Sequence, residues 1–238
     1  MLLALLVGAA AVGCHNSCVT FVWNFGGTTP VTPPSCSLTK ASAVVDLRLT
    51  SIPAADTGTA THPRHLFLTI RGIQALPREA SGEEPSDWVD LAPRLISHPL
   101  QVDLMEQADD SCRLGLLSGN VVVAGVYTQI RLRLLTTQQI ASGPAPQEDA
   151  CGALGFNCIV AADGSARPLV FDSQTQEIPI RSDGIRGGFF QILPETHTSL
   201  ALEFNPYASR MFAAAEAVRL SPVFTLEVRP PCDSAARQ

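Results

Sequence analysis

Short runs of alternating apolar and polar residues are the feature that most constrains how this chain can fold. These runs occupy residues 45–50, 66–71, 129–134, 200–205 and 224–228. A period of two puts every second side chain on one face of an extended strand, so each run predicts a strand with one buried face. Clusters rich in Gly, Pro, Ser and Asp separate the runs, as at 54–63, 78–87 and 142–149. Many short strands divided by turns predict an all-β fold, an antiparallel β-sandwich of the immunoglobulin or transthyretin type.

One segment has a composition that favours a helix instead. Residues 208–218 are rich in Ala and contain Met and Glu, which are good helix formers. We therefore expect at most one short helix, and this is the only segment that could form it. No internal repeat or sharp change in composition divides the rest, so the sequence predicts a single sandwich domain over 41–232 and a disordered tail over 233–238.

The N-terminus carries an apolar run, Leu2 to Gly13, that ends abruptly at a cysteine. A membrane-spanning helix needs ~20 apolar residues, and this run is shorter. A signal peptide has an apolar stretch of ~7–15 residues followed by small residues, so we expect a signal peptide over 1–13. The positively charged start that is usual in signal peptides is missing here.

The segment "AVGC" at the end of this run resembles a bacterial lipobox, although Ala11 stands where a lipobox usually has Leu. The resemblance implies cleavage before Cys14 and attachment of a lipid to its thiol. The alternative is an ordinary secreted protein in which Cys14 remains a thiol or joins a disulfide. Residues 24–40 are rich in Thr, Pro and Gly, which suits an extended tether, so 14–40 would link a lipid anchor to the domain.

The seven cysteines fit an exported chain. Lipidation of Cys14 would leave six, an even number that allows complete pairing. Cys151 and Cys158 flank a short Gly-containing segment, so we expect a local disulfide between them. Cys18 with Cys36, and Cys112 with Cys232, are the further candidate pairs. No CxxC motif is present, which argues against a zinc site.

Charge and motifs exclude several classes of function. The net charge of −6 argues against nucleic-acid binding. The chain has no GxSxG or HExxH motif, and its five histidines are scattered without evident partners. We therefore expect no enzymatic activity, no catalytic residue, no cofactor and no metal site.

One predicted strand carries residues that could bind a ligand. Tyr127, Gln129, Arg131 and Arg133 would share one face if the alternation is unbroken, and arginine donors suit a carboxylate or a sugar. The opposite face would bury Ile130, Leu132 and Leu134. An ordinary solvated face is the simpler interpretation, and we favour it.

The same strand carries a family resemblance. "VAGVYTQIRLRL" (123–134) resembles the "aGtYtqIRL" signature of the bacterial DUF4382 family. Other segments resemble family motifs in the same order, among them "LTIRGIQAL" (68–76), "LQVDLMEQ" (100–107), "IPIRSDGIRGGFF" (178–190) and "LALEFNPYASRM" (200–211). The resemblance extends over about 41–229. It implies an exported, often lipid-anchored domain, and it implies no activity, because the family has none assigned.

These observations lead to one expected function and one alternative. We expect a non-enzymatic, lipid-anchored envelope or surface domain, exported and held at the outer membrane, that binds an unidentified partner. An exposed strand edge that accepts a further strand would be its natural mode of binding. The alternative is a carbohydrate-binding module in which Trp88, Tyr127 or Tyr207 stacks on a sugar ring.

Overall fold

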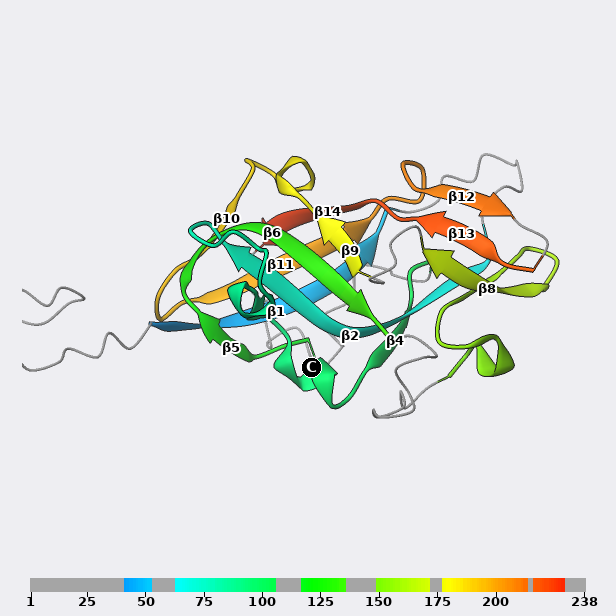
Figure 1. The fold of residues 1–238 in the computed structure, drawn as a ribbon, viewed down its shortest axis with the longest axis horizontal. Helices are drawn as coiled ribbons and strands as arrows, with labels where there is room; N and C mark the ends of the chain where they lie inside the picture. The colour runs from blue at the N-terminus through cyan, green and yellow to red at the C-terminus, as the bar shows by residue number, and fades with distance from the viewer. Residues whose placement is uncertain are drawn as a thin grey trace, which may run out of the picture. The chain divides into compact units, whose positions relative to one another are not determined.

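The computed structural model describes residues 41–52, 63–105, 117–135, 149–171, 177–213 and 216–229. Its regular elements are strands and short 3₁₀ turns (Figure 1). The strands are β1 (Ser42–Ser51), β2 (His65–Pro77), β3 (Val89–Asp90), β4 (Leu100–Asp103), β5 (Asn120–Val123), β6 (Gly125–Leu134), β7 (Cys158–Val160), β8 (Ala166–Phe171), β9 (Glu177–Ile180), β10 (Phe190–Ile192), β11 (His197–Phe204), β12 (Arg210–Ala213), β13 (Val218–Ser221) and β14 (Phe224–Arg229). The turns are η1 (Pro85–Asp87), η2 (Pro93–Ile96), η5 (Gly152–Leu154) and η6 (Ser182–Gly184).

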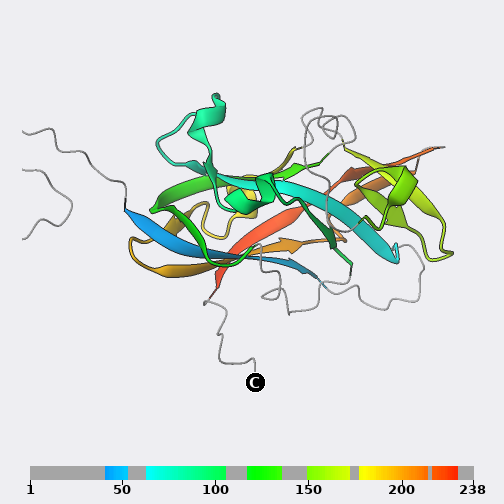
Figure 2. The same cartoon turned by 90° about the horizontal axis from the view of Figure 1, so that it is seen from below.

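The strands form two sheets that lie against each other as two layers (Figure 2). The small sheet has the order β14-β11-β1-β5. The large sheet follows the path β10-β6-β2-β7-β8-β13-β12, with β3 and β4 also paired to β2 and β9 to β6. This is the all-β sandwich that the alternating runs predict.

Apolar side chains from both sheets form one hydrophobic core between the layers. Leu47 and Leu49 of β1, Leu200 and Leu202 of β11, and Leu132 of β6 are each at most 2% exposed. All five alternating runs are strands, so the period of two correctly predicts which segments are extended.

The sheets are mixed, whereas the sequence predicts an antiparallel sandwich. β1 pairs with β11 in parallel, with Leu47 opposite Leu200, and β8 pairs with β13 in parallel. The other strand pairs are antiparallel. Alternation reports only which side chains are buried, and it is the same for both directions of pairing, so it could not reveal these two parallel neighbours.

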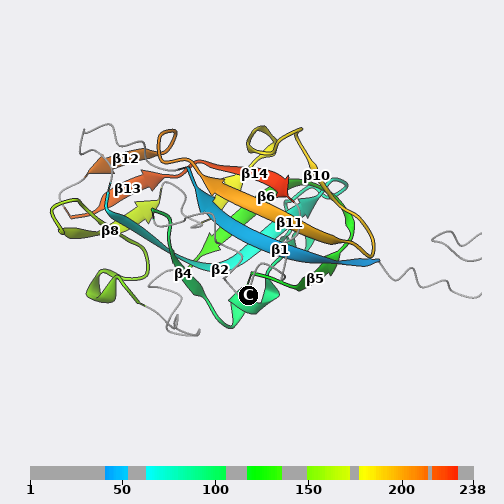
Figure 3. The same cartoon turned by 180° about the vertical axis from the view of Figure 1, so that it is seen from behind.

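One long, bent hairpin links the two sheets. Its proximal arms, β11 and β14, pair in the small sheet, and its distal arms, β12 and β13, pair in the large sheet. The bend lies at Asn205, whose side-chain oxygen accepts hydrogen bonds from the backbone N–H groups of Tyr207 and Ala208. Pro222 interrupts the returning arm, and there the backbone N–H of Val223 donates to the Ser209 hydroxyl. The distal arms join β8 at one end of the sandwich, opposite the end at which β1 begins (Figures 1 and 3).

The segment 208–218, which could have formed a short helix, forms two strands instead. Arg210–Ala213 forms β12 and Val218–Ser221 forms β13, paired with Met211 opposite Leu220. The intrinsic helical preference of Ala is only a few tenths of a kcal/mol per residue, and pairing within the large sheet overrides it.

Candidate functional site

The outward face of β6 carries the predicted ligand residues. Ile130, Leu132 and Leu134 are buried in the core, at most 1% exposed, as the alternation predicts. Arg131 and Arg133 lie on the opposite face, where the strand rows bring them beside β2 and β9. Gln129 shares this face and is half-buried.

Tyr127 does not belong to this face, contrary to the prediction. Its side chain is 1% exposed, stacks on Phe190 with ring centroids 5.3 Å apart, and donates a hydrogen bond to the Val123 carbonyl. A β-bulge is the cause: Leu76 pairs with Gln129 and Pro77 pairs with Tyr127, so Thr128 is an extra residue in β6. A bulge shifts the phase of alternation by one, which sends Tyr127 into the core.

Burial changes the acidity of Tyr127. Removal from water, with a smaller contribution from the charge of Glu79, raises the pKa of its phenol to about 12. The phenol is therefore neutral at physiological pH and acts as a hydrogen-bond donor.

A second bulge places a further arginine, Arg71 of β2, opposite Arg133 on this face. Ile70 pairs with Leu134 and Gly72 pairs with Arg133, so Arg71 is the extra residue of β2. The charge of Arg71 interacts with Arg133 and with Glu177, which pair with each other across β6 and β9. We call Arg71, Arg131, Arg133 and Glu177 the arginine platform.

Arg131 is the best-enclosed member of the arginine platform. Its Nε donates to Gln74 Oε1 at 2.9 Å, and its Nη1 contacts Glu177 Oε2 at 3.0 Å. The Trp88 ring lies over its guanidinium at 4.0 Å, and the side chain is only 16% exposed. Gln74 in turn donates to Asp90. Burial is the main cause that lowers the pKa of Arg131. This half of the face is a closed polar network and not the freely solvated surface that we favoured.

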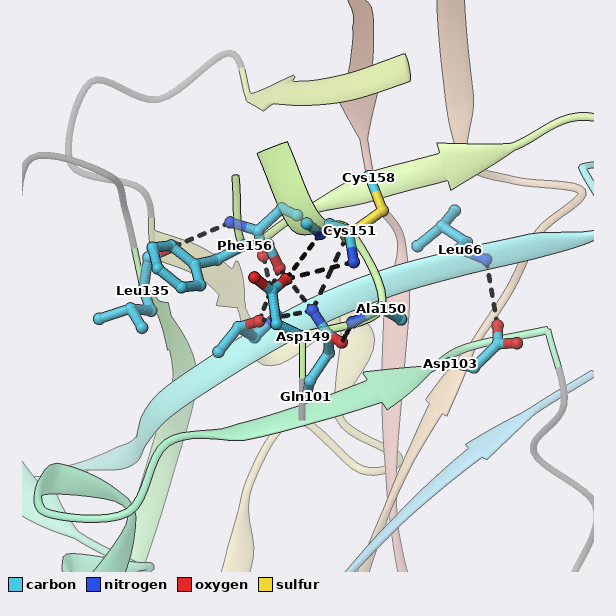
Figure 4. Close-up of a disulfide and its surroundings, with 12 residues drawn as sticks. Leu66, Gln101, Asp103, Leu135, Asp149, Ala150, Cys151, Phe156 and Cys158 are labelled. Atoms are coloured by element: carbon cyan, nitrogen blue, oxygen red, sulfur yellow. Dashed lines mark hydrogen bonds between the residues drawn. A yellow bond between two sulfur atoms is a disulfide. The ribbon is translucent and has the colours of Figure 1, made fainter. Parts of the chain in front are cut away.

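The predicted disulfide between Cys151 and Cys158 is confirmed, with the two Cα atoms 5.7 Å apart (Figure 4). Asp149 accepts hydrogen bonds from the backbone of Cys151 and Gly152, and Gln101 accepts one from Ala150. Asn157 attaches the loop to the large sheet, because its side chain bonds Thr69 N and Leu135 O. The disulfide is thus part of the scaffold. The other candidates lie outside the described residues: Cys14, Cys18, Cys36, Cys112 and Cys232.

Two histidines have carboxylate partners that the sequence did not reveal. His65 Nδ1 lies 2.6 Å from Asp103, which also accepts the backbone N–H groups of Leu66 and Met105. His197 Nε2 lies 2.7 Å from Asp46. The partners are 38 and 151 residues apart in the chain, so no local pattern could have indicated them. Both carboxylates are under 10% exposed, and Asp46 also accepts a hydrogen bond from the backbone N–H of Gly119.

The described part of the chain contains no group of three or more His, Cys, Asp or Glu side chains arranged to hold a metal ion. Among the same residues, no helix is long and apolar enough to cross a membrane.

The far end of the large sheet offers a strand edge and a pocket. β12 is the last strand of the sheet, and Phe212 on it is 55% exposed. Phe212 lies opposite Arg219 on β13, which lies opposite the half-exposed Val170 on β8. These three residues form one row on the outward face.

The pocket beside β12 has a volume of about 310 Å³. Met211, Ala213 and Val218 contribute apolar lining from β12 and β13, and Ile159 contributes from β7. Asp163 and Arg167 add one negative and one positive charge to the lining, and Ser165 adds a hydroxyl. An added strand at β12 would thus meet apolar side chains on either face of the sheet, because its side chains alternate between the two faces.

Comparison with known proteins gives a match, which extends over most of the described domain. No curated protein and no solved structure matches the chain. The model of one family, described as a domain of unknown function (DUF4382), matches residues 43–222, which is most of the chain and runs from β1 to the end of β13. The chain therefore belongs to the DUF4382 family, as the motif around "YTQIRL" indicates.

Proposed function

We propose that this chain is a non-enzymatic binding domain of the cell envelope that accepts an extended segment of a partner protein at the edge of β12. A lipid on Cys14 and the tether that follows it would hold the domain at the membrane. The partner segment would add to the large sheet as a further strand, through backbone hydrogen bonds and alternate side chains.

The observation that carries this proposal is that the edge of β12 is exposed. Sheet edges usually carry protection against pairing with other chains, such as proline, charge or a covering loop. β9 has Pro179, which has no N–H to donate. The edge strand β14 is approached by the η6 loop, where Arg186 N donates to Leu226 O. Within the described residues, β12 has no proline and no covering loop, carries one charge at its start, Arg210, and exposes Phe212. The edge strand β5 also lacks a proline and exposes Val121, so it serves below as the matched comparison.

The surroundings of β12 indicate the chemistry of the partner segment. Apolar groups lie on both sides of the strand, in the pocket and at Phe212. The exposed Arg210 begins the strand, while Arg167 shares the pocket lining with Asp163, whose charge opposes it. A segment that combines apolar residues with Asp or Glu would match this edge, because the acid would face Arg210 at the rim of an apolar contact.

The carbohydrate-binding alternative has less support. Stacking on sugars needs exposed rings, and Tyr127 is in the core. One face of Trp88 is occupied by the guanidinium of Arg131. Tyr207 is 47% exposed but is a single ring.

Site-specific photocrosslinking in the producing cells tests the proposal. A photoreactive phenylalanine analogue at position 212 should give a discrete adduct, and mass spectrometry should place the crosslink in an extended apolar-acidic segment of another protein. The matched control is the same analogue at Val121, which is 66% exposed on β5, an edge strand of the small sheet.

A second variant adds a charge to the edge. Phe212→Asp should abolish the adduct from an analogue placed at Val170, while the fold, judged by circular dichroism, is retained because position 212 is exposed. Equal adducts at 212 and 121, or no adduct at 212, would contradict strand addition at β12.

A further inference from the structure

Among the residues that the structure describes, the arginine platform sets three arginines against one carboxylate, Glu177. Arg71, Arg131 and Arg133 surround Glu177, and Asp90 on the far side is bonded to Gln74. Arg131 is already satisfied by Glu177, Gln74 and the Trp88 ring. The other two guanidinium groups therefore carry the excess.

Arg71 has the most unused hydrogen-bonding capacity. It forms no hydrogen bond or ion pair with any residue in the described ranges, although it is half-buried. Arg133 makes one ion pair within those ranges, from Nε to Glu177 at 3.5 Å. Two neighbouring guanidinium groups thus present N–H donors on one half-buried surface.

The backbone brings these like charges together through two local features. The bulge at Arg71 makes both Arg71 and Gly72 lie opposite Arg133. Gly72 has no side chain, and a Cβ there would lie 3.7 Å from Arg133 Cβ and Cδ, so the Arg133 side chain crosses the sheet in contact with this glycine. Bulges often redirect a side chain next to a binding site.

We propose that Arg71 and Arg133 form a binding site for an oxyanion, a carboxylate or phosphate group of a ligand. Arginine binds such groups with two parallel N–H donors, which gives strength and a fixed orientation. The bound group would lie over Gly72, and Glu177 would hold Arg133 from the other side. This site is separate from β12 and does not depend on the strand addition proposed above.

The acidity of Arg71 is consistent with an anion at this position. Burial and then the charge of Arg133 lower the pKa of Arg71, and Glu177 only partly opposes them. A bound oxyanion would remove this repulsion between the two arginines, which is a favourable contribution that a water molecule cannot supply.

Nuclear magnetic resonance of the arginine side chains tests the site in the full chain. The Nε–Hε signals of Arg71 and Arg133 should shift and saturate when sodium phosphate or sodium glucuronate replaces sodium chloride at constant ionic strength. We expect millimolar dissociation constants, as for a small anion on two donors. Tighter binding of glucuronate would identify a carboxylate as the natural group, and tighter binding of phosphate would identify a phosphoryl group.

Variants distinguish anion binding at this site from the nonspecific attraction of anions to surface arginines. Arg71→Gln should weaken binding at least tenfold, Arg71→Lys should give an intermediate value, and Arg64→Gln, at an exposed arginine just before β2, should leave the binding of the anion unchanged. Because the Arg71 side chain has no hydrogen-bond or ion-pair partner in the described ranges, the variant should retain its melting temperature. Shifts that rise linearly without saturation, or that persist unchanged in Arg71→Gln, would overturn the proposal.

Discussion

Arg131 and Leu132 are neighbours on β6 that face opposite sides of the large sheet. Leu132 is fully buried between the sheets. Arg131 is enclosed by Trp88, Gln74 and Glu177 on the outward face. Each side chain contributes to stability by a different mechanism, apolar burial in one case and a charged hydrogen-bond network in the other.

Truncation of the two residues should show both mechanisms. Leu132→Ala should lower the free energy of unfolding by ~2–5 kcal/mol, because it removes buried methyl groups and leaves a cavity. Arg131→Ala should lower it by ~1–3 kcal/mol, since it removes a cation–π contact and leaves Gln74 and Glu177 without their donor. Urea unfolding of both variants measures these changes in the free energy of unfolding.

Gln129→Ala is the matched control on the outward face of β6. It should cost within ~0.5 kcal/mol, as is usual for a surface position. An equally small cost for Arg131→Ala would show that the polar network contributes nothing to folding, as the sequence-based interpretation of a solvated face predicts.

The buried phenol of Tyr127 predicts a loss of stability in alkali. Its folded pKa of about 12 lies above the ordinary value of 10.0, so the phenol remains neutral in the folded state over a range in which the unfolded state ionises. Stability should be unaffected by this group below about pH 10 and should fall by ~2–3 kcal/mol as the pH rises to about 12. Tyr127→Phe should remove this loss of stability at high pH. Chemical unfolding at a series of pH values would detect the difference.

At the scale of elements, the disulfide loop predicts a modest contribution to stability. Cys151 and Cys158 enclose a short loop, seven residues apart. Closing so short a loop restricts the unfolded chain only slightly, so we expect Cys151→Ser with Cys158→Ser to cost ~2–3 kcal/mol. Differential scanning calorimetry measures the change.

The loop should nevertheless stay in place in this double variant. Asn157 still bonds the backbone of Thr69 and Leu135, independently of the sulfur atoms. Asn157→Ala is the comparison, because it leaves two buried backbone groups unsatisfied. If the double serine variant fails to fold at all, the loop is held by the disulfide alone and this account is wrong.

The sequence predicted the strands well and their irregularities poorly. Alternation located β1, β2, β6, β11 and β14, because one-sided burial produces it directly. The bulges at Arg71 and Thr128 are single-residue changes of register that depend on the partner strand. They decide that Arg71 lies beside Arg133 and that Tyr127 leaves the polar face. The alternation therefore predicted the polar positions Gln129, Arg131 and Arg133, but not which side chains the bulges bring next to them.

At the scale of the whole molecule, one core predicts one unfolding transition. Residues from both sheets belong to the same buried cluster, and Leu220 of β13 connects it to the far end of the large sheet. We expect the calorimetric and van't Hoff enthalpies to agree, as in a two-state transition. An earlier, separate transition that Phe212→Asp shifts would instead show that β8, β12 and β13 unfold independently.

The proposed attachment to the membrane also concerns the whole molecule. The mature chain should begin at Cys14 and carry a lipid there, because the apolar run ends at "AVGC". Mass spectrometry of the N-terminal peptide decides this, and Cys14→Ser should move the protein from the membrane fraction to the soluble fraction. A soluble wild-type product with a free Cys14 thiol would contradict the anchor.

The position of β1 has a consequence for when the domain can form. β1 is the first described strand, yet it lies inside the small sheet, between β5 and β11. Its parallel neighbour begins at His197, so Val44 finds its partner only after some 150 further residues have been made. At synthesis rates of ~5–20 residues per second, β1 waits for roughly ten seconds or more without its main neighbour. The small sheet therefore depends on distant contacts, which are slow to form, and it cannot be completed until the last fifth of the chain has been made. If the chain is exported as proposed above, it would reach a translocation channel before the two sheets have closed on each other.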